Sequence, residues 1–429
     1  MNEQTIHISD ILPDYHTAGG ALAGAYDSCG GNSGVSILNT SRNEYAAFCA
    51  SLIEQGAILA ASNVITDNRF ATYLLTDADG TEYAVYTMFY TVTCNARIIF
   101  GKRAYLPTVT ESGGFSAPTY VSQPVRDGIY NGNRGETITG APGMAYVITL
   151  ADGTFLLIDS GPRCTKVKTK HLENGVWVDD EEREADDAKR LYDYIKARTP
   201  ENEKSVIAAW FFTHPHSDHV HTAHDFLARY KDEVEVRLGA FNFPDFQKYP
   251  TKHENNESLC SLVSTTAERL EGAGATLWHF HTGQRISFPG CEVEILFTPE
   301  DYLPKEFAWG NHTSSAFRMT FAGKTFMVLG DCEKDICQLM ADKYGAYLKS
   351  DILQLSHHGV NGACVALYRC IDPEYCFWPI DEFRFTTDSR CTGTISHGFH
   401  FNAWLRDETV RRRHHYHNSA DVTIRTDIP

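Results

Sequence analysis

The sequence predicts a mixed α/β (α+β) protein in which layered sheets are flanked by helices and preceded by a small α+β unit. Hairpin signals come early, and after about residue 184 strands alternate with helices, as in such layers. A stretch rich in Thr, Ser, Gly and Pro at 111–124 marks a linker. Hydrophobic residues form 42% of the 429 residues, enough for a large core. We therefore predict a small α+β domain at 1–110 and a larger domain at 125–429.

The first domain has one clear helix signal followed by strand-like runs. Ser41 and Glu44 fit a capping box, apolar residues then recur at helical spacing up to Ile53, and Gly56 stands where a helix would stop. Strand-like runs span 70–75, 82–86 and 96–100, with a turn at 77–80. We expect one helix on a short antiparallel sheet, and no ligand cluster indicates a role for it.

The second domain opens with a hairpin signal. Two apolar runs at 145–150 and 154–159 are joined by Ala151-Asp152-Gly153. Helical spacing then marks 184–198. The later strands are predicted at 206–212, 233–238, 275–280, 292–297, 315–321, 325–329 and 351–355. The later helices are predicted at 221–230, 258–271, 334–344 and 363–370.

Four potential metal ligands lie within six residues, directly after the buried strand predicted at 206–212. They are His214, His216, Asp218 and His219. The cluster begins where that strand ends, so we place it on a loop at a sheet edge. The two histidines that come first are two residues apart and point the same way in an extended segment. The other two ligands follow past a turn and can face a second ion. Imidazole and carboxylate ligands in this density predict a site for zinc, iron or a related ion.

Two further candidates each adjoin an apolar strand. Asp331 follows Gly330 at the end of the strand predicted at 325–329, and its carboxylate can bridge two cations. The alternative is an ordinary turn aspartate that closes a hairpin. His312 precedes the strand predicted at 315–321 and can complete the first metal site with His214 and His216. Its alternative is a loop histidine beside the strand entry.

The adjacent histidines His357 and His358 follow the strand predicted at 351–355. Vicinal histidines tend to point apart, so one is a ligand and the other supports it or faces the substrate. The sequence leaves open which is which. Gly359 permits close approach of a bound group next to this pair.

This order of ligands resembles the metallo-β-lactamase superfamily, and Ile158-Asp159-Ser160-Gly161 looks like the end of that family's opening strands. The resemblance covers about residues 125–429 and implies an αββα sandwich with two metals at one sheet edge. It implies that the first ion is held by His214, His216 and His312, the second by Asp218, His219 and His358, with Asp331 as the bridge. The segment from Leu329 to Gly359 looks most like the hydrolase-like domain of competence DNA-uptake proteins.

The function expected from this site is metal-dependent hydrolysis. A water on a divalent ion has its pKa lowered towards about 7, which gives a metal-bound hydroxide at a dinuclear site. Zinc is the expected metal, and manganese and iron also suit mixed histidine and carboxylate ligands. We expect Asp218 to orient the nucleophile as well as bind metal. His357 is the second expected catalytic residue, protonating the leaving group or stabilising the developing anion.

The substrate is less well defined than the reaction. A phosphodiester is suggested by the competence-protein resemblance. The alternative is an esterase or lactonase that acts on a small carbonyl compound, with an apolar wall formed by Tyr302, Phe307 and Trp309. A non-catalytic metal-binding module is a third class, against which the full ligand set argues. A flavin-dependent di-iron enzyme is disfavoured because the motif holds histidines and no flavin-like tail follows.

Charge and cysteine usage limit the partners. The net charge is −17, from 38 basic and 55 acidic residues, which argues against a broad nucleic-acid footprint, although a metal pair can itself receive phosphate. The basic run Arg411 to His417 is interpreted as a solvated surface segment rather than an anion site. The twelve cysteines form no Cys-x-x-Cys pair, and neither a signal peptide nor a bilayer-length apolar run is visible. We expect a cytoplasmic protein without a membrane partner.

Overall fold

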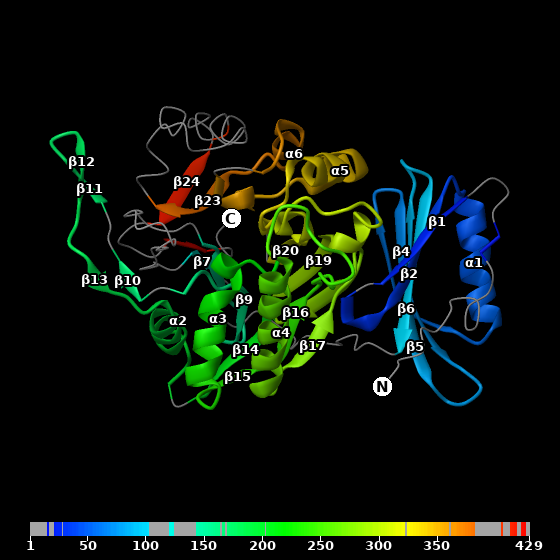
Figure 1. Ribbon diagram of the computed structural model, residues 1–429, viewed down its shortest axis with the longest axis horizontal. Coiled ribbons are helices and arrows are strands. Elements are labelled where there is room, and N and C mark those ends of the chain that lie inside the picture. The colour runs from blue at the N-terminus through cyan, green and yellow to red at the C-terminus, as the bar shows by residue number, and fades with distance from the viewer. Residues whose placement is uncertain are drawn as a thin grey trace.

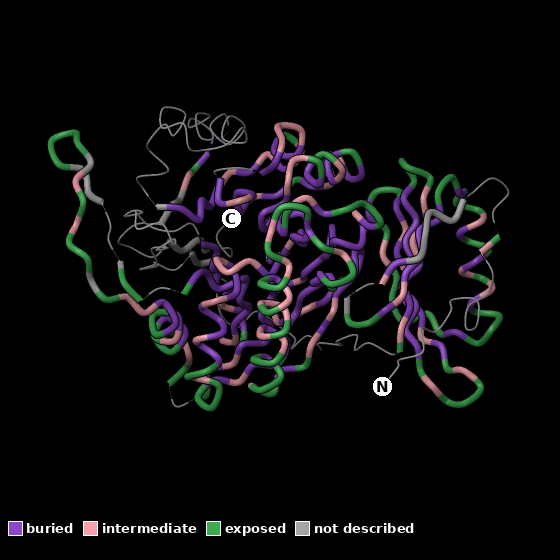
Figure 2. Tube along the Cα trace, in the orientation of Figure 1, coloured by how far each residue is buried: buried purple, intermediate pink, exposed green. Residues whose placement is uncertain are grey.

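A computed structural model shows a two-sheet sandwich with a smaller sheet domain beside it (Figure 1). It describes residues 15–16, 21–27, 29–102, 120–123, 143–163, 165–167, 170–201, 203–321, 324–359, 362–381, 405, 412–417 and 422–425. Buried residues fill the spaces between the layers of both parts, and exposed residues line the outer turns and helix faces (Figure 2).

The first sheet of the sandwich is mixed. Its strands pair in the order β17 (Thr276–His279), β16 (Leu238–Phe241), β14 (Ser205–Phe211), β9 (Phe155–Asp159), β8 (Ala145–Thr149), β7 (Tyr120–Gln123) and β25 (Val422–Arg425), with β15 (Val234–Val236) also on β14. The strands from β9 to β17 run parallel, whereas β8, β7 and β25 are antiparallel to their neighbours. Residues 207–211 are buried on both faces, which explains the continuous apolar run.

The second sheet has an antiparallel half and a parallel half. Its strands pair in the order β18 (Arg285–Phe288), β19 (Cys291–Phe297), β20 (Ala316–Phe321), β21 (Lys324–Val328), β22 (Ile352–Gln354), β23 (Tyr375–Asp381) and β24 (Arg413–His417). Pairing is antiparallel as far as β21 and parallel from β21 to β24. An apolar layer that includes Phe211, Trp278 and Phe317 fills the space between the two sheets.

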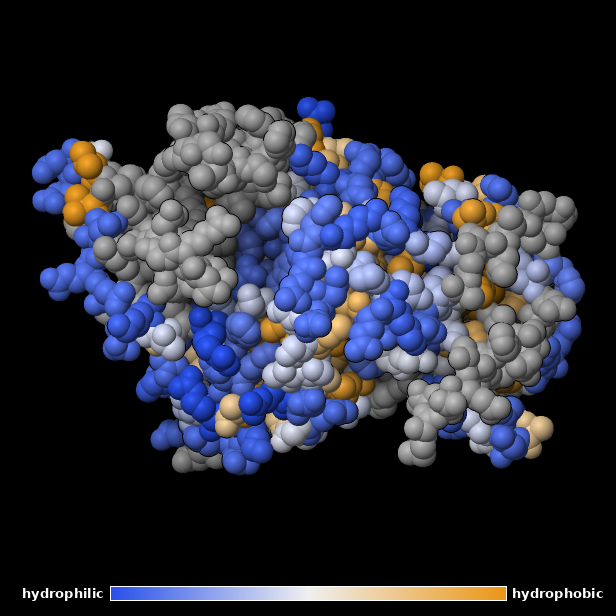
Figure 3. Space-filling view, in the orientation of Figure 1, coloured by the Kyte–Doolittle hydropathy of each residue, from blue (hydrophilic) through white to orange (hydrophobic). Residues whose placement is uncertain are grey.

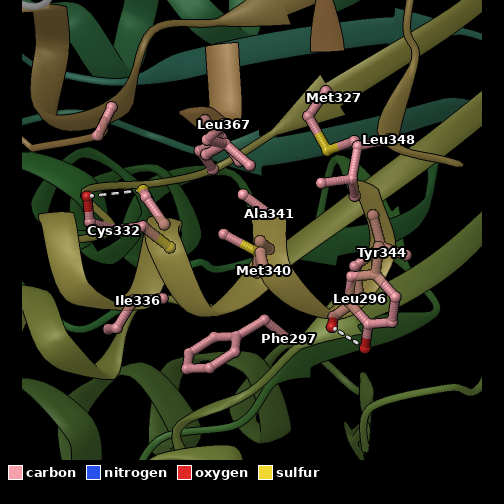
Figure 4. Packing of buried hydrophobic residues seen from close by; sticks show 14 of the residues in the cluster. Leu296, Phe297, Met327, Cys332, Ile336, Met340, Ala341, Tyr344, Leu348 and Leu367 are labelled. Atoms are coloured by element: carbon pink, nitrogen blue, oxygen red, sulfur yellow. Dashed lines mark hydrogen bonds between the residues drawn. The ribbon is translucent and has the colours of Figure 1, made fainter. Parts of the chain in front are cut away.

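Helices cover the outer face of each sheet. The first sheet carries α2 (Asp187–Lys196), α3 (Ser217–Tyr230) and α4 (Asn256–Gly272), packed through a separate apolar cluster. The second carries α5 (Lys334–Tyr344) and α6 (Val365–Ile371). Figure 4 shows Ile336, Met340 and Tyr344 of α5 in one cluster with Leu296, Phe297 and Met327 of the second sheet, and the Tyr344 hydroxyl donates to the Leu296 carbonyl at 2.9 Å. The described residues thus form an αββα sandwich, and the predicted fold class is confirmed.

The N-terminal unit is a six-stranded antiparallel sheet with one helix. The strand order is β1 (Ala21–Asp27), β2 (Ser33–Leu38), β6 (Asn95–Lys102), β5 (Glu82–Tyr90), β4 (Asn68–Thr76) and β3 (Ile58–Ile65). Helix α1 (Arg42–Glu54) begins at the predicted capping box, in which Ser41 and Glu44 each accept a backbone N–H of the other. It covers the sheet face turned away from the sandwich (Figure 1).

The opposite face of this sheet packs against the sandwich. Asn63 donates to the Gly283 carbonyl at 3.1 Å and to Glu294 at 2.9 Å. Gly283 has φ +87°, and a Cβ on it would lie 2.0 Å from the ring of Phe70. Apolar residues of both parts share one cluster, so the two parts form a continuous core across this contact.

Several sequence predictions need correction. Strand β7 lies inside the predicted linker and pairs with β8, so that segment already belongs to the first sheet. The basic run at 411–417 contains β24, which pairs with β23. Arg412 is buried and donates to the Pro373 carbonyl and to Asp372, whereas the Arg413 side chain is 67% exposed. The prediction of a solvated segment is therefore wrong for Arg412. The strand predicted at 233–238 is instead two elements, since that range contains all of β15 and the first residue of β16.

Smaller elements complete the described chain. Two-stranded pairs join β10 (Lys166–Val167) to β13 (Arg183–Glu184) and β11 (Lys170–Glu173) to β12 (Val176–Asp179), and the second pair projects away from the sandwich (Figure 1). Short 3-10 turns are η2 (Cys29–Gly31), η3 (Pro299–Asp301), η4 (Gly310–Thr313), η5 (Gly345–Leu348) and η6 (Ser356–Gly359). Within the described residues, no helix has the length and apolar character needed to cross a bilayer. Hydrophilic residues dominate the face drawn in Figure 3.

Candidate metal centre

The His-x-His-x-Asp-His segment follows β14 and runs directly into α3. His216 is the N-cap of α3 in an extended conformation, and the helix starts at Ser217. Asp218 and His219 therefore lie in the first helical turn, and not on a loop as the sequence predicted. A carboxylate and an imidazole placed in a first turn have fixed directions, because the helix backbone holds both.

Two groups of potential ligand atoms meet at the sheet edge where β14 ends and α3 begins, which we call the rim. One contains His214, His219 and Asp331, and the other contains Asp218, His219 and His358; within each group the ligand atoms lie within 4.8 Å of one another. His219 belongs to both groups. Residues that are far apart in the sequence thus converge as the metal-site hypothesis requires.

Asp331 belongs to the first group and also faces His358 of the second. One carboxylate oxygen is 3.4 Å from His219 Nε2, and the other is 3.3 Å from His358 Nε2 and 3.9 Å from His214 Nε2. His358 Nε2 is also 3.1 Å from Asp218 Oδ2. On the other side of the centre, His214 Nε2 is 3.0 Å from His216 Nδ1. These distances are compatible with a carboxylate shared by two ions.

The unpaired atoms of the centre support a metal-binding role. Among the described residues, His219 Nε2, Asp331 Oδ1 and both ring nitrogens of His358 are buried without a hydrogen-bond partner. Buried polar atoms are nearly always satisfied, so several orphans in one place point to a missing ligand. Imidazole and carboxylate donors suit zinc, manganese and iron alike. The residues present therefore fit a divalent metal.

A left-handed turn at Gly330 positions Asp331 at the rim. Gly330 has φ +54°, and a Cβ there would come within 2.7 Å of Thr213. The Asp331 N–H donates to Ser314 Oγ at 3.1 Å. A glycine is needed before the aspartate because the turn is left-handed and the motif segment lies against it.

The two adjacent histidines have different positions. Both adopt left-handed backbone conformations, with φ +48° for His357 and +58° for His358, which are uncommon for residues with a Cβ. His358 is buried and joins a ligand group. The ring of His357 is half-buried, 3.3 Å from the Asn311 amide and 3.8 Å from Asp331. The geometry favours His358 as the ligand and leaves His357 beside the centre.

His312 lies outside the two groups of converging atoms. It belongs to η4, where the ring folds back so that Nδ1 accepts the Trp309 N–H at 3.3 Å. Its Nε2 faces Asp335 at 3.7 Å. A role for His312 in the first site therefore stays a prediction, since its two ring nitrogens face the Trp309 N–H and Asp335 in this structure.

Asp159 supports the centre from behind, a role that the sequence analysis did not assign. Its buried carboxylate accepts hydrogen bonds from His219 Nδ1 at 2.6 Å, from the Thr213 N–H at 2.8 Å and from the Thr213 hydroxyl at 2.7 Å. This leaves Nε2 of His219 free to bind a metal. The signal was the Ile-Asp-Ser-Gly sequence at the end of β9, which the analysis used only for its resemblance.

Glu254 is a second residue that the analysis did not single out. It lies before α4, and its Oε2 is 3.0 Å from His216 Nε2. No motif or periodicity marks it, since the segment that carries it is irregular in structure.

Carboxylates dominate the electrostatics of the centre. Burial opposes ionisation of Asp331, but the neighbouring histidines hold the pKa of its carboxyl well below the usual range. Burial likewise opposes a charge on His219, yet its carboxylate neighbours raise the pKa of that imidazole well above the ordinary value. Burial lowers the pKa of His214. The centre therefore keeps ionised carboxylates in a buried position, which favours cations.

The known proteins to which this chain is similar share little sequence identity with it. No family model matches the chain, and no curated protein matches it. One similar solved structure is CmlA, a diiron β-hydroxylase from Streptomyces venezuelae, with 11% identity and a TM-score of 0.37 over 76% of this chain and 55% of that one. The chain thus corresponds to about half the length of the hydroxylase. Another is described as a metal-dependent hydrolase from Parabacteroides distasonis, with 11% identity and a TM-score of 0.31 over 81% of this chain and 98% of that one.

Proposed function

We propose that this chain is a hydrolase that depends on two divalent metal ions. The observation that carries the proposal is the convergence of five buried or half-buried ligand side chains, three of which have buried polar atoms without a hydrogen-bond partner. The five are His214, Asp218, His219, Asp331 and His358, and the unpartnered atoms belong to His219, Asp331 and His358. His216 adjoins them through His214, because the two rings lie 3.0 Å apart. A structural cluster would pair its buried polar atoms internally, and this one leaves them open towards a common point.

The proposed ligand assignment follows the distances. His214 Nε2 and His216 Nδ1 would hold the first ion, and Asp218, His219 and His358 the second. Asp331 would bridge them. When bound, divalent ions lower the pKa of water towards about 7 and polarise the group under attack. We propose zinc, with manganese and iron as alternatives.

We propose that two further side-chain functions assist the reaction, one of Asp218 and one of His357. Asp218 is 28% exposed, so its carboxylate is accessible from the rim and can orient the attacking water. His357 is 23% exposed, and burial lowers its pKa. A neutral imidazole there can donate one N–H to the charge that develops on the substrate, as an oxyanion-stabilising group does. This favours charge stabilisation over proton donation for His357.

The substrate proposal has two branches. A phosphodiester is the first, because the Leu329 to Gly359 segment resembles the competence-protein hydrolase. A small ester or lactone is the second, and Trp309 favours it. Trp309 is 43% exposed and its ring lies 4.8 Å from the His253 ring, and its neighbour Gly310 donates to Glu254. Phe307, expected in the same apolar wall, is instead buried in the core.

A substrate panel tests the proposal. The zinc-loaded protein would be assayed against bis(p-nitrophenyl) phosphate, p-nitrophenyl acetate, a simple lactone and a β-lactam. Turnover of the phosphodiester alone supports the first branch, and turnover of the ester or lactone alone supports the second. A protein that folds, binds two ions and leaves every probe intact would contradict hydrolysis of these classes. Unchanged turnover in Asp331→Ala would contradict the proposed site.

A further inference from the structure

Glu254 touches His216 on the side away from the converging ligand atoms. Its Oε2 is 3.0 Å from His216 Nε2, whereas His216 Nδ1 is 3.0 Å from His214 Nε2. A carboxylate can only accept a hydrogen bond, so the proton of the neutral imidazole is held on Nε2. The lone pair is then on Nδ1, the atom that faces the centre.

The position of Glu254 is fixed by its backbone surroundings and does not depend on His216. Two irregular segments run side by side there. Lys252 N donates to the Phe307 carbonyl at 3.0 Å, and His253 N donates to the Ala308 carbonyl at 3.2 Å. The Gly310 N–H then donates to Glu254 Oε2 at 3.0 Å. Glu254 is therefore held in place before any ion binds, as a preorganised support requires.

Gly310 shows how closely this contact is packed. A Cβ at this position would lie 2.4 Å from His216 Nε2 and 2.8 Å from Glu254 Oε2. No side chain fits between the two partners without moving one of them. Glycine at 310 thus preserves the contact between the carboxylate and the imidazole.

We propose that Glu254 is a positioning residue that fixes the ring orientation and tautomer of His216, so that Nδ1 is presented to the first ion. The inference rests on the proposed function and deepens it. Glu254 acts through His216 and does not bind the ion. Partners of this kind hold a metal-binding histidine by its second nitrogen, and their loss weakens metal affinity by about 10–100-fold.

The test compares zinc affinity in Glu254→Ala and Glu254→Gln by titration against a competing chelator, after circular dichroism shows that both are folded. Glu254→Ala should bind one of the two ions about 10–100-fold more weakly and keep the other. Glu254→Gln should stay close to the wild type, because the glutamine carbonyl still accepts from Nε2–H. Gly310→Ala should weaken the same ion by a separate route.

Glu306→Ala is the matched control. Glu306 is an exposed acidic residue on the same paired segments, 2.6 Å from Lys252. The control should bind both ions as the wild type does. If Glu306→Ala weakened zinc binding as much as Glu254→Ala does, the loss would come from a disturbed backbone of these segments, and the inference would be overturned. Full affinity in Glu254→Ala, or a loss in Glu254→Gln as large as in Glu254→Ala, would overturn it too. A wild-type chain that takes up no divalent ion would overturn the proposed function itself, and the inference with it.

Discussion

Two buried aspartates, Asp301 and Asp331, have very different surroundings. Asp301 lies where the N-terminal unit meets the sandwich, and its carboxylate accepts the hydroxyls of Tyr90 and Thr282. Lys343 Nζ adds a positive charge at 3.5 Å. Asp331 is equally buried, but its close neighbours at the rim are imidazoles, and one of its oxygens lacks a partner among the described residues.

The difference teaches how to separate a structural charge from a functional one. A buried carboxylate costs free energy unless donors satisfy it, and Asp301 has such donors. An imidazole satisfies Asp331 only when the nitrogen that faces it carries a proton, and without that proton the same nitrogen offers a lone pair to a cation. We therefore expect Asp301 to matter for folding and Asp331 for metal binding, and the following substitutions test that contrast.

The largest effect is expected for Asp331→Ala. The proposed bridge disappears, so activity should fall by about 10³-fold or more, because metal polarisation supplies several kcal/mol of transition-state stabilisation. Bound metal per chain should fall as well. At a pH above the folded pKa of His219, where the neighbouring imidazoles are neutral, the melting temperature of the metal-stripped variant should match or exceed that of the metal-stripped wild type, since a buried charge without a protonated partner has been removed. A large drop in that melting temperature would show that Asp331 stabilises the fold, as Asp301 is expected to do.

Asp301→Ala should give the opposite result. It leaves Lys343 buried without its carboxylate partner, which costs roughly 3–5 kcal/mol of unfolding free energy. Urea denaturation measures the loss, and metal analysis of the folded fraction should be unchanged. Loss of metal at full stability would reverse the assignment of the two aspartates.

Asp159→Asn has a smaller expected effect. An asparagine side chain can direct its NH₂ group to His219 Nδ1, which forces the ring proton onto the metal-facing Nε2. Metal affinity should fall by about 10–100-fold, as for other supporting partners. Competition with a chelator measures it, and Asp225→Asn serves as a control that makes the same change at an aspartate of α3 that pairs with Arg163. Equal losses in both variants would argue against the tautomer effect.

The smallest effect expected is on pH dependence. The carboxylates around His219 raise its pKa in the ion-free protein, so the protonated folded form is favoured. This contribution to stability is complete below the unfolded pKa of about 6.5 and is lost as the pH rises through the folded pKa. Metal binding requires the deprotonated ring, so zinc affinity should rise with pH over the same range. Zinc affinity independent of pH between 6 and 8 would contradict a role for His219 as a ligand.

Much of the fold was accessible from the sequence because strong local signals matched the tertiary structure. The capping box at Ser41 starts α1, and the turn at Asp77 to Gly80 joins β4 to β5. Elements without such signals were missed, among them β3, whose exposed residues show no alternation, and β24, whose basic residues resemble a solvated run. Their pairing depends on neighbours distant in the chain.

The site was accessible only in part for the same reason. The density of ligand types between His214 and His219 predicted where it lies. The ring direction of His312 depends on a turn that contacts Trp309, which the sequence pattern does not reveal. Glu254 could not be found because it meets Gly310, which is 56 residues away, through an irregular segment. Such contacts exist only in the folded chain.

Metal content measured by inductively coupled plasma mass spectrometry tests the central claim most directly. Wild-type protein loaded with zinc and passed through a desalting column should retain two ions per chain, and Asp331→Ala treated in parallel should retain fewer. Retention of no ion by the folded wild type, or of two by the variant, would contradict a dinuclear centre built around Asp331.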